Sequence, residues 1–179
     1  MAKQVETVYG DALFELAIEE NRVDVFYDEV RFLIQVLDEN RDFMAMMTHP
    51  QIPQDEKLQT VDTIFKGKIS DEIIGLMRMI VEKGHFSEIK SVLSYFVDRV
   101  KEYKNIGVAH VSTPMELTED QKDRIEKRLL ETTDYKSFEM DYKVDEELIG
   151  GIVIRIGDRV VDSSIRTKLY NLSRELSRA

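Results

Sequence analysis

The 179-residue chain contains no cysteine. This absence excludes a disulfide framework, a thiol nucleophile and a thiolate metal site, and it fits a cytosolic location. The sequence also lacks any apolar run of the roughly 18 to 20 residues that a membrane-spanning helix needs. Its opening, MAKQVETVYGD, has neither the apolar core of a signal peptide nor the Arg-rich bias of a transit peptide. We therefore expect a soluble chain without a targeting segment.

Basic residues are outnumbered by acidic ones, 25 against 35, which gives a formal net charge of −10. A protein that binds nucleic acid generally needs a basic surface to neutralise phosphates. The charge balance therefore argues against a general nucleic-acid binder and favours protein partners. Apolar residues make up 42% of the chain, which is enough to bury a core in one or two small domains.

Helical periodicity runs from residue 4 to about residue 104. It is interrupted at two prolines and two glycines: Pro50, Pro53, Gly67 and Gly84. The pattern predicts six helices, at about 4–20, 23–39, 41–47, 54–66, 71–83 and 87–104. After Asn105-Ile106-Gly107 the period changes from 3.6 to 2, which indicates a domain boundary. We expect a mainly α protein, with a six-helix bundle in residues 1–105 and a small α/β domain in residues 106–179.

The second domain alternates apolar and polar residues in three places, at 108–112, 138–144 and 152–156. The last of these strands turns at Gly157-Asp158 into residues 159–161, which predicts a hairpin. Thr118 and Gln121 have the spacing of a capping box at a helix start. A final helix carries one apolar stripe, formed by Ile165, Leu169, Leu172 and Leu176. We expect a short mixed or antiparallel sheet with two helices.

The first and fifth predicted helices carry apolar arcs that are wider than a surface helix of a small bundle needs. In the first helix Phe14 and Ile18 add a second apolar patch away from the main arc. Two explanations are open. In the first, both helices are central in the bundle and buried on all sides. In the second, they together form a groove that receives an amphipathic helix from a partner.

The sequence offers no candidate catalytic residue, cofactor site or metal site. Gly150-Gly151 precedes a strand instead of opening a helix, so the pair does not form a phosphate-binding loop. His49, His85 and His110 lie far apart and have no metal-ligand spacing. Pairs of acidic residues fall at helix ends or in loops, where solvated charge is the ordinary explanation.

Charge is divided by sign within the second domain. Residues 150–179 contain six basic and three acidic residues, whereas residues 106–149 contain six basic and twelve acidic ones. Only Tyr170 is interleaved with the basic residues as a base-stacking platform, so an RNA-binding surface is weakly supported. Docking against an acidic or mixed-charge helix of another protein is favoured.

Three segments of the chain carry a family resemblance. The segment VDEELIGGIVIRIGDRVVDSSIRTKLYNLSREL, residues 144–176, resembles the C-terminal signature of the delta subunit of F-type ATP synthase. The mitochondrial counterpart of that family is the oligomycin-sensitivity-conferring protein. VYGDALFELAIE, residues 8–19, is similar to the first helix of the family, and VSTPMELTEDQ, residues 111–121, is similar to its entry into the second domain. The resemblance covers nearly the whole chain.

The resemblance implies a non-catalytic stator subunit that resists rotation of the catalytic head. Its helical domain would bind N-terminal segments of the alpha subunits, and its C-terminal domain would bind the b-type subunits of the peripheral stalk. It implies one copy per complex, at the cytoplasmic face of a bacterial cell membrane, with membrane contact only through the complex. The alternative from another class is a regulatory or RNA-binding two-domain module.

The resemblance also implies which residues meet each partner. The groove for the alpha-subunit helix falls on Tyr9, Ala12, Leu13, Leu16, Leu76, Met79 and Ile80. The stalk-facing or signature residues are Gly150, Gly151, Arg155, Asp158, Asp162, Arg166 and Lys168. Ser163 stands where the family commonly has glycine, and it would be strained if the site required positive φ. We expect Asp162 or Ser163 to cap the last helix, with Ser163 as the favoured cap.

Overall fold

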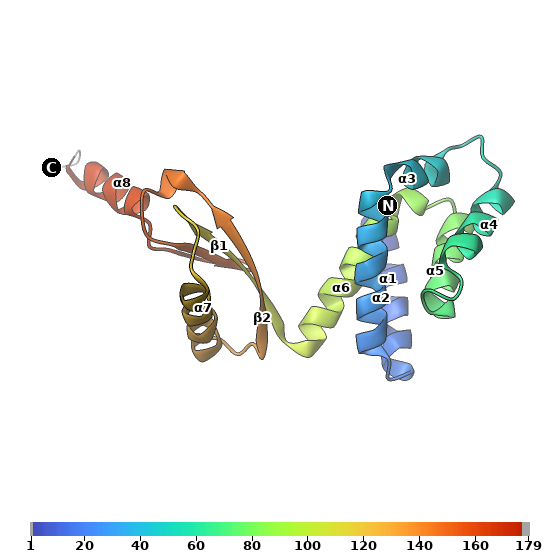
Figure 1. Ribbon diagram of the computed structural model, residues 1–179, viewed down its shortest axis with the longest axis horizontal. Helices are drawn as coiled ribbons and strands as arrows, with labels where there is room; N and C mark the ends of the chain where they lie inside the picture. The colour runs from blue at the N-terminus through green and yellow to red at the C-terminus, as the bar shows by residue number, and fades with distance from the viewer. Residues whose placement is uncertain (1, 177–179) are drawn as a thin grey trace. The chain divides into compact units, whose positions relative to one another are not determined.

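The computed structural model describes residues 2–176, with side chains from residue 5 onward. The chain divides into two compact units, Met1–Val100 and Lys101–Ala179 (Figure 1). Helix α6, Ile89–Lys104, contains the division, whereas the change of period placed the boundary after this helix, near residue 105. The last turn of α6 is therefore part of the second unit, where Lys101 forms an ion pair with Glu139.

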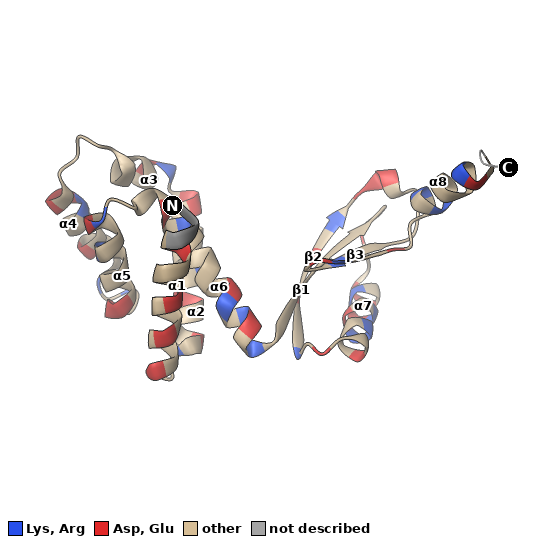
Figure 2. Cartoon of the chain, turned by 180° about the vertical axis from the view of Figure 1, so that it is seen from behind, with Lys and Arg blue, Asp and Glu red and all other residues tan. Residues whose placement is uncertain are grey.

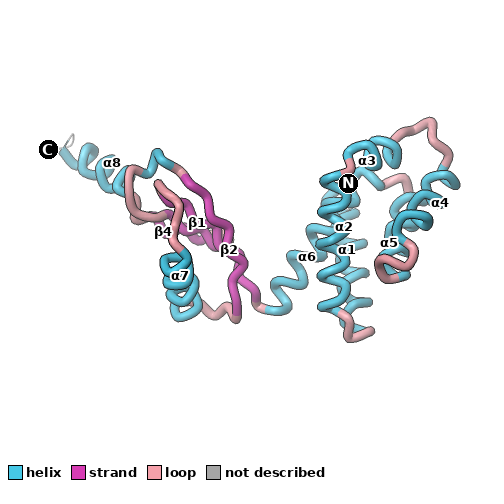
Figure 3. Tube along the Cα trace, in the orientation of Figure 1, coloured by secondary structure: helices cyan, strands magenta, loops and turns pink. Residues whose placement is uncertain are grey.

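All six predicted helices are present, and their ends agree with the prediction to within two residues (Figure 3). They are α1 (Ala2–Glu19), α2 (Val23–Glu39), α3 (Arg41–Thr48), α4 (Gln54–Phe65), α5 (Asp71–Glu82) and α6, with a 3-10 turn η1 (Phe86–Glu88) before α6. One apolar core joins them, and its largest fully buried side chains include Phe26, Phe65 and Phe96. Phe43 meets Phe65 and Phe86 edge-on, each at 6.0 Å between ring centres, so the short α3 is held to the core by aromatic contacts.

The second unit contains a mixed sheet, which is one of the two kinds that the sequence left open. Its elements are β1 (Ile106–Thr113), α7 (Glu119–Thr132), β2 (Ser137–Val144), the 3-10 turn η2 (Glu146–Leu148), β3 (Val153–Ile156), β4 (Arg159–Asp162) and α8 (Ile165–Leu176). The strand order is β2-β1-β3-β4. β1 is parallel to β2 and antiparallel to β3, and β3 forms the predicted hairpin with β4. Gly157, with φ +54°, opens the two-residue hairpin turn.

Helix α7 packs on one face of the sheet, next to β2 (Figure 1). At its start the backbone N–H of Thr118 donates to Gln121 Oε1 at 2.9 Å, which agrees with the predicted capping box. The core under this helix is small and centres on Ala109, Leu129 and Phe138. Gly107 has no room for a side chain, because a Cβ there would overlap the rings of Phe138 and Tyr135. The β3–β4 hairpin lies in the same sheet, on the other side of β1 from β2.

Candidate functional site

Helices α1 and α5 contact each other in the first unit. Beside this contact Ala12 and Met79 are exposed, and Met79 keeps 48% of its surface accessible. Tyr9 and Leu16 are half-buried. These four residues, which we call the α1–α5 seam, offer a limited apolar surface from two adjacent helices.

The other three predicted groove residues belong to the core. Leu13 is 1% exposed, Leu76 is 8% exposed and Ile80 is completely buried. A partner would meet little or no surface from these side chains. They instead hold α1 and α5 in the bundle, so their substitution is expected to disturb the fold itself.

Of the second apolar patch of α1, Phe14 is buried beside α6, whereas Ile18 is 38% exposed. The Tyr95 hydroxyl donates to Asp11 Oδ1 at 3.1 Å, and Arg99 Nε donates to the same oxygen at 3.2 Å. The Arg99 guanidinium lies 5.2 Å from the centre of the Phe14 ring. Gly10 is required at this contact, because any Cβ would clash with the Tyr95 ring. The apolar residues of α1 therefore contact several helices of the bundle, and burial against α6 accounts for Phe14.

Polar contacts join the end of α1 to the start of α5. Arg22 Nη2 donates to Ser70 Oγ at 2.7 Å, and Arg22 Nη1 reaches Glu72 Oε1 at 3.4 Å. Glu29 accepts a hydrogen bond of 2.9 Å from the backbone N–H of Ser70. These bonds connect the turn after α1 with the residue that precedes α5. No sequence pattern pointed to this link, because Ser70 and Glu72 lie about 50 positions from Arg22.

Gly150-Gly151 forms a tight turn before β3. Gly151 has φ +82°, and a Cβ there would lie 2.5 Å from the carbonyl oxygen of Ser163. The backbone N–H of Ile165 donates to the Gly150 carbonyl at 2.9 Å, and that of Ser163 donates to the Ile152 carbonyl at 3.0 Å. The signature motif therefore brings the turn before β3 against the start of α8.

Ser164, and not Ser163, is the side-chain cap of α8. Its Oγ accepts from the backbone N–H of Thr167 at 3.2 Å, and the residue is fully buried. The expectation for Ser163 is wrong because the helix starts at Ile165, one residue later than a cap at 163 requires. Ser163 Oγ donates to the Ile152 carbonyl at 3.1 Å instead, and its backbone does not have positive φ.

Asp162 is not the cap of α8 either, but it takes part in this turn. Its carboxylate accepts from the backbone N–H of Ser164 at 2.8 Å and from Thr167 Oγ1 at 2.7 Å. The pKa of Asp162 is lowered below its ordinary value of 3.8, chiefly by the hydrogen bond from the Ser164 backbone. The nearby positive charge of Arg166 lowers this pKa further. Asp162 is therefore a fixed anion at the start of α8.

Helix α8 has no buried residue among those that the structure describes. Its predicted apolar stripe, Ile165, Leu169, Leu172 and Leu176, is between 43% and 78% exposed. We call this stripe the α8 face. Arg166 and Lys168 lie on the same helix, which carries more basic than acidic side chains (Figure 2). Arg166 reaches Glu147 at 3.4 Å in an exposed ion pair.

The seven predicted stalk-facing residues fall in two places. Four of them lie where η2, the glycine turn and α8 meet: Gly150, Gly151, Asp162 and Arg166. Lys168 follows on the first turn of α8. Arg155 and Asp158 belong to the β3–β4 hairpin, with Arg155 on β3 and Asp158 in the turn. The hairpin residues are exposed but are not part of the contacts at the start of α8.

A family model described as ATP synthase delta (OSCP) subunit matches residues 5–176. The chain belongs to this family. The ATP synthase subunit delta of Lachnoclostridium phytofermentans is 46% identical over 176 residues, which is 98% of this chain and 97% of that relative. The ATP synthase subunit delta of Lactobacillus johnsonii is 29% identical over 174 residues, 97% of this chain and 95% of that relative.

The fold of the delta (OSCP) family is also found among solved structures. A chain in the cryo-EM structure of the Toxoplasma gondii mitochondrial ATP synthase hexamer matches with a TM-score of 0.76 over 96% of both chains. The two sequences are 18% identical, so this likeness shows the shared fold. It agrees with the predicted mainly helical chain that has a small α/β domain at its C-terminal end.

Membership of the delta (OSCP) family assigns the chain to ATP synthesis as a subunit of ATP synthase. Within residues 2–176, no helix is long and apolar enough to cross a membrane. Across the same part of the chain, no cluster of three or more His, Asp or Glu side chains could hold a metal ion.

Proposed function

We propose that the chain is a non-catalytic stator subunit of the proton-translocating F-type ATP synthase. It links the alpha/beta catalytic head to the b-type peripheral stalk. The observation that supports this role best is that each unit has its own exposed apolar surface, the α1–α5 seam in the first and the α8 face in the second. A linking subunit needs two such surfaces, because it must hold two partners at once.

The stator role has a mechanical reason. The central rotor exerts torque on the catalytic head, and a head free to turn with the rotor would uncouple proton flow from ATP synthesis. A subunit that holds the head to the stalk resists this torque through its binding energy at both ends. Such a subunit needs no catalytic residue and no cofactor.

The α1–α5 seam receives the amphipathic N-terminal helix of an alpha subunit. The seam offers accessible apolar surface on two adjacent helices, which suits the apolar face of a helix. This surface comes from Tyr9, Ala12, Leu16 and Met79. Met79 is unbranched and flexible, so it can adapt to the side chains of the bound helix. The buried Leu13, Leu76 and Ile80 act indirectly, because they fix the two helices that form the surface.

The α8 face binds the b-type subunits of the stalk. Four exposed apolar side chains at helical spacing suit a helical partner, and Arg166 and Lys168 favour a partner with acidic residues beside its apolar stripe. Gly150, Gly151 and Asp162 fix the start of α8 and so orient this face. Arg155 and Asp158 of the hairpin add a second, polar part of the stalk-facing surface.

In this role the chain is present once per complex, at the cytoplasmic face of a bacterial cell membrane. It contacts the membrane only through the other subunits. Nucleic acid is not a partner, since the acidic net charge of −10 disfavours phosphate backbones.

Calorimetric titration with a synthetic peptide tests the head-binding surface. The peptide is the N-terminal segment of the alpha subunit from the same organism, and the wild-type chain is expected to bind it one-to-one with a negative heat-capacity change. Met79→Asp is expected to weaken binding by about tenfold or more, because it places a charge in the apolar contact.

Val25→Asp is the matched control. Val25 lies on α2 and is 45% exposed, close to the 48% of Met79, so both changes put a new carboxylate on the surface of the same bundle. The control is expected to bind the peptide like wild type. Equal loss in both variants, or no binding by a folded wild-type chain, would count against the seam as the alpha-subunit site.

A further inference from the structure

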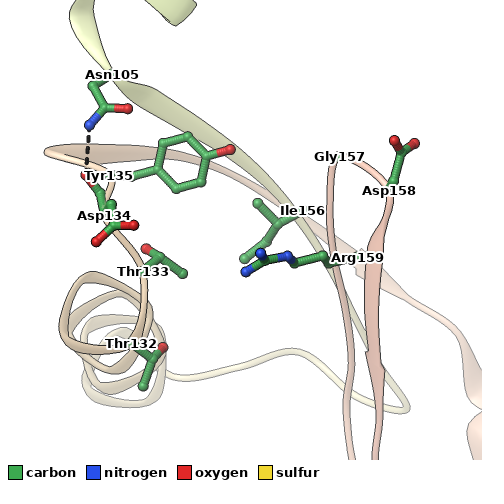
Figure 4. Close-up of a pocket in the computed structure, with 9 residues that line it drawn as sticks. All are labelled: Asn105, Thr132, Thr133, Asp134, Tyr135, Ile156, Gly157, Asp158 and Arg159. Atoms are coloured by element: carbon green, nitrogen blue, oxygen red, sulfur yellow. Dashed lines mark hydrogen bonds between the residues drawn. The ribbon is translucent and has the colours of Figure 1, made fainter.

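A cavity of about 590 Å³ opens in the second unit, near the ends of the strands at which β1 and β2 begin (Figure 4). It is lined by Asn105, by residues 132–135 between α7 and β2, and by residues 156–159 at the tip of the β3–β4 hairpin. The α8 face does not include this space, and of the proposed stalk-facing residues only Asp158 lines it. Helix α8 contacts η2, which follows the far end of β2, whereas the cavity lies at the ends where β1 and β2 begin.

The walls of the cavity are held in place by the protein itself. The side-chain amide of Asn105 donates to the Asp134 carbonyl at 2.6 Å, and the backbone N–H of Lys136 donates to the Asn105 carbonyl at 2.9 Å. The Tyr135 ring meets the Phe138 ring edge-on at 5.3 Å. These contacts fix the positions of Asn105, Asp134 and Tyr135 in the wall of the cavity. The volume of the cavity lies in the range of about 300 to 1,000 Å³ that is typical of small-molecule sites.

The strand register explains why Arg159 lines this cavity. Ile156 pairs with Ala109 on β1 and with Arg159 on β4, so all three residues lie on the same face of the sheet. Helix α7 covers the part of this face that β1 and β2 form. Figure 4 shows the side chains of Tyr135, Ile156 and Arg159 directed into the same space, while the carboxylate of Asp158 points away. Among the side chains that the structure describes, the Arg159 guanidinium makes no hydrogen bond or ion pair.

We propose that this cavity binds a small organic anion that carries a flat apolar group, in chemical class an aromatic carboxylate. A guanidinium pairs with a carboxylate through two parallel hydrogen bonds, and Arg159 supplies that group. Tyr135 and Ile156 supply aromatic and aliphatic surface for the flat part of the ligand. Asp134 and Asp158 also line the cavity, so its lining carries two carboxylates beside the one guanidinium. The Asp158 carboxylate points away from the space (Figure 4), and the charge of Asp134 limits the affinity for an anion.

The test is an NMR titration of the full-length, 15N-labelled chain with benzoate as the probe. Saturable shifts of the amides of Tyr135 and Gly157 are expected. Arg159→Gln is expected to weaken binding about tenfold by removing a charge-assisted hydrogen bond. Asp134→Asn is expected to strengthen binding, and it keeps the wall intact because Asn105 bonds to the Asp134 backbone and not to its side chain.

Arg155→Gln and benzamidine are the controls. Arg155 is the neighbour of Ile156 on β3 and so faces the other side of the sheet, and its loss removes the same charge without touching the cavity. Benzamidine has the same ring with a positive charge and is expected not to bind. Equal shifts with benzamidine, equal benzoate affinity in Arg159→Gln, or no localised shift at millimolar benzoate would overturn the proposal.

Thermal melting of the same variants separates ligand binding from a purely internal role. If Arg159 and Asp134 served only to attract each other, Arg159→Gln and Asp134→Asn would both lower the melting temperature and leave the benzoate titration unchanged. That combination would also overturn the proposal. Unchanged melting with opposite effects on benzoate affinity would support it.

Discussion

At the scale of single residues, Gly151 is the position where the signature motif depends most on having no side chain. Its φ of +82° is unfavourable for other residues, and a Cβ would lie 2.5 Å from the Ser163 carbonyl oxygen. Gly151→Ala is therefore expected to lower the free energy of unfolding of the second unit by about 1 to 3 kcal/mol, as measured by urea denaturation followed through the NMR signals of β1. The matched control is Gly75→Ala in α5, where a Cβ meets open space and helix propensity favours alanine. A similar loss of stability in both variants would contradict the role of the Gly151 turn.

At the scale of elements, the start of α8 depends on the Ser164 cap. Ser164→Ala removes the acceptor for the Thr167 backbone N–H and is expected to cost about 1 kcal/mol of stability. Amide hydrogen exchange at Thr167 and Lys168 should become faster, because these residues form the first turn of α8. Ser163→Ala is the control and should have the smaller effect, since the backbone N–H of Ser163 still donates to the Ile152 carbonyl. A larger effect at Ser163 would show that the cap is assigned to the wrong serine.

Local patterns predicted the elements well because helical and strand periodicity reflect which face of each element is buried. The six helices, the capping box at Thr118 and the hairpin turn at Gly157 all follow from spacing within a few residues. Contacts between distant segments could not be predicted in this way. The apolar residues of α1 contact several helices of the bundle, and the pattern alone does not reveal that Phe14 packs beneath Arg99. The shift of the cap from Ser163 to Ser164 is a one-residue error at a helix end, where spacing constrains the structure least.

At the scale of the whole molecule, the proposed role requires that the two partner surfaces can be weakened independently. Arg166→Glu with Lys168→Glu should weaken binding of the b-type stalk subunits about tenfold at low salt and less at high salt, because the change reverses exposed charges beside the α8 face. The same variant should bind the alpha-subunit peptide normally, and Met79→Asp should show the opposite pattern. Binding of both partners to each variant can be measured by calorimetry. Lys127→Glu with Arg128→Glu on α7 is the matched control, since both residues are exposed and the net charge changes equally. Loss of both partners in either α8 or α5 variant, in a protein that remains folded, would contradict the separation of head and stalk binding between the two units.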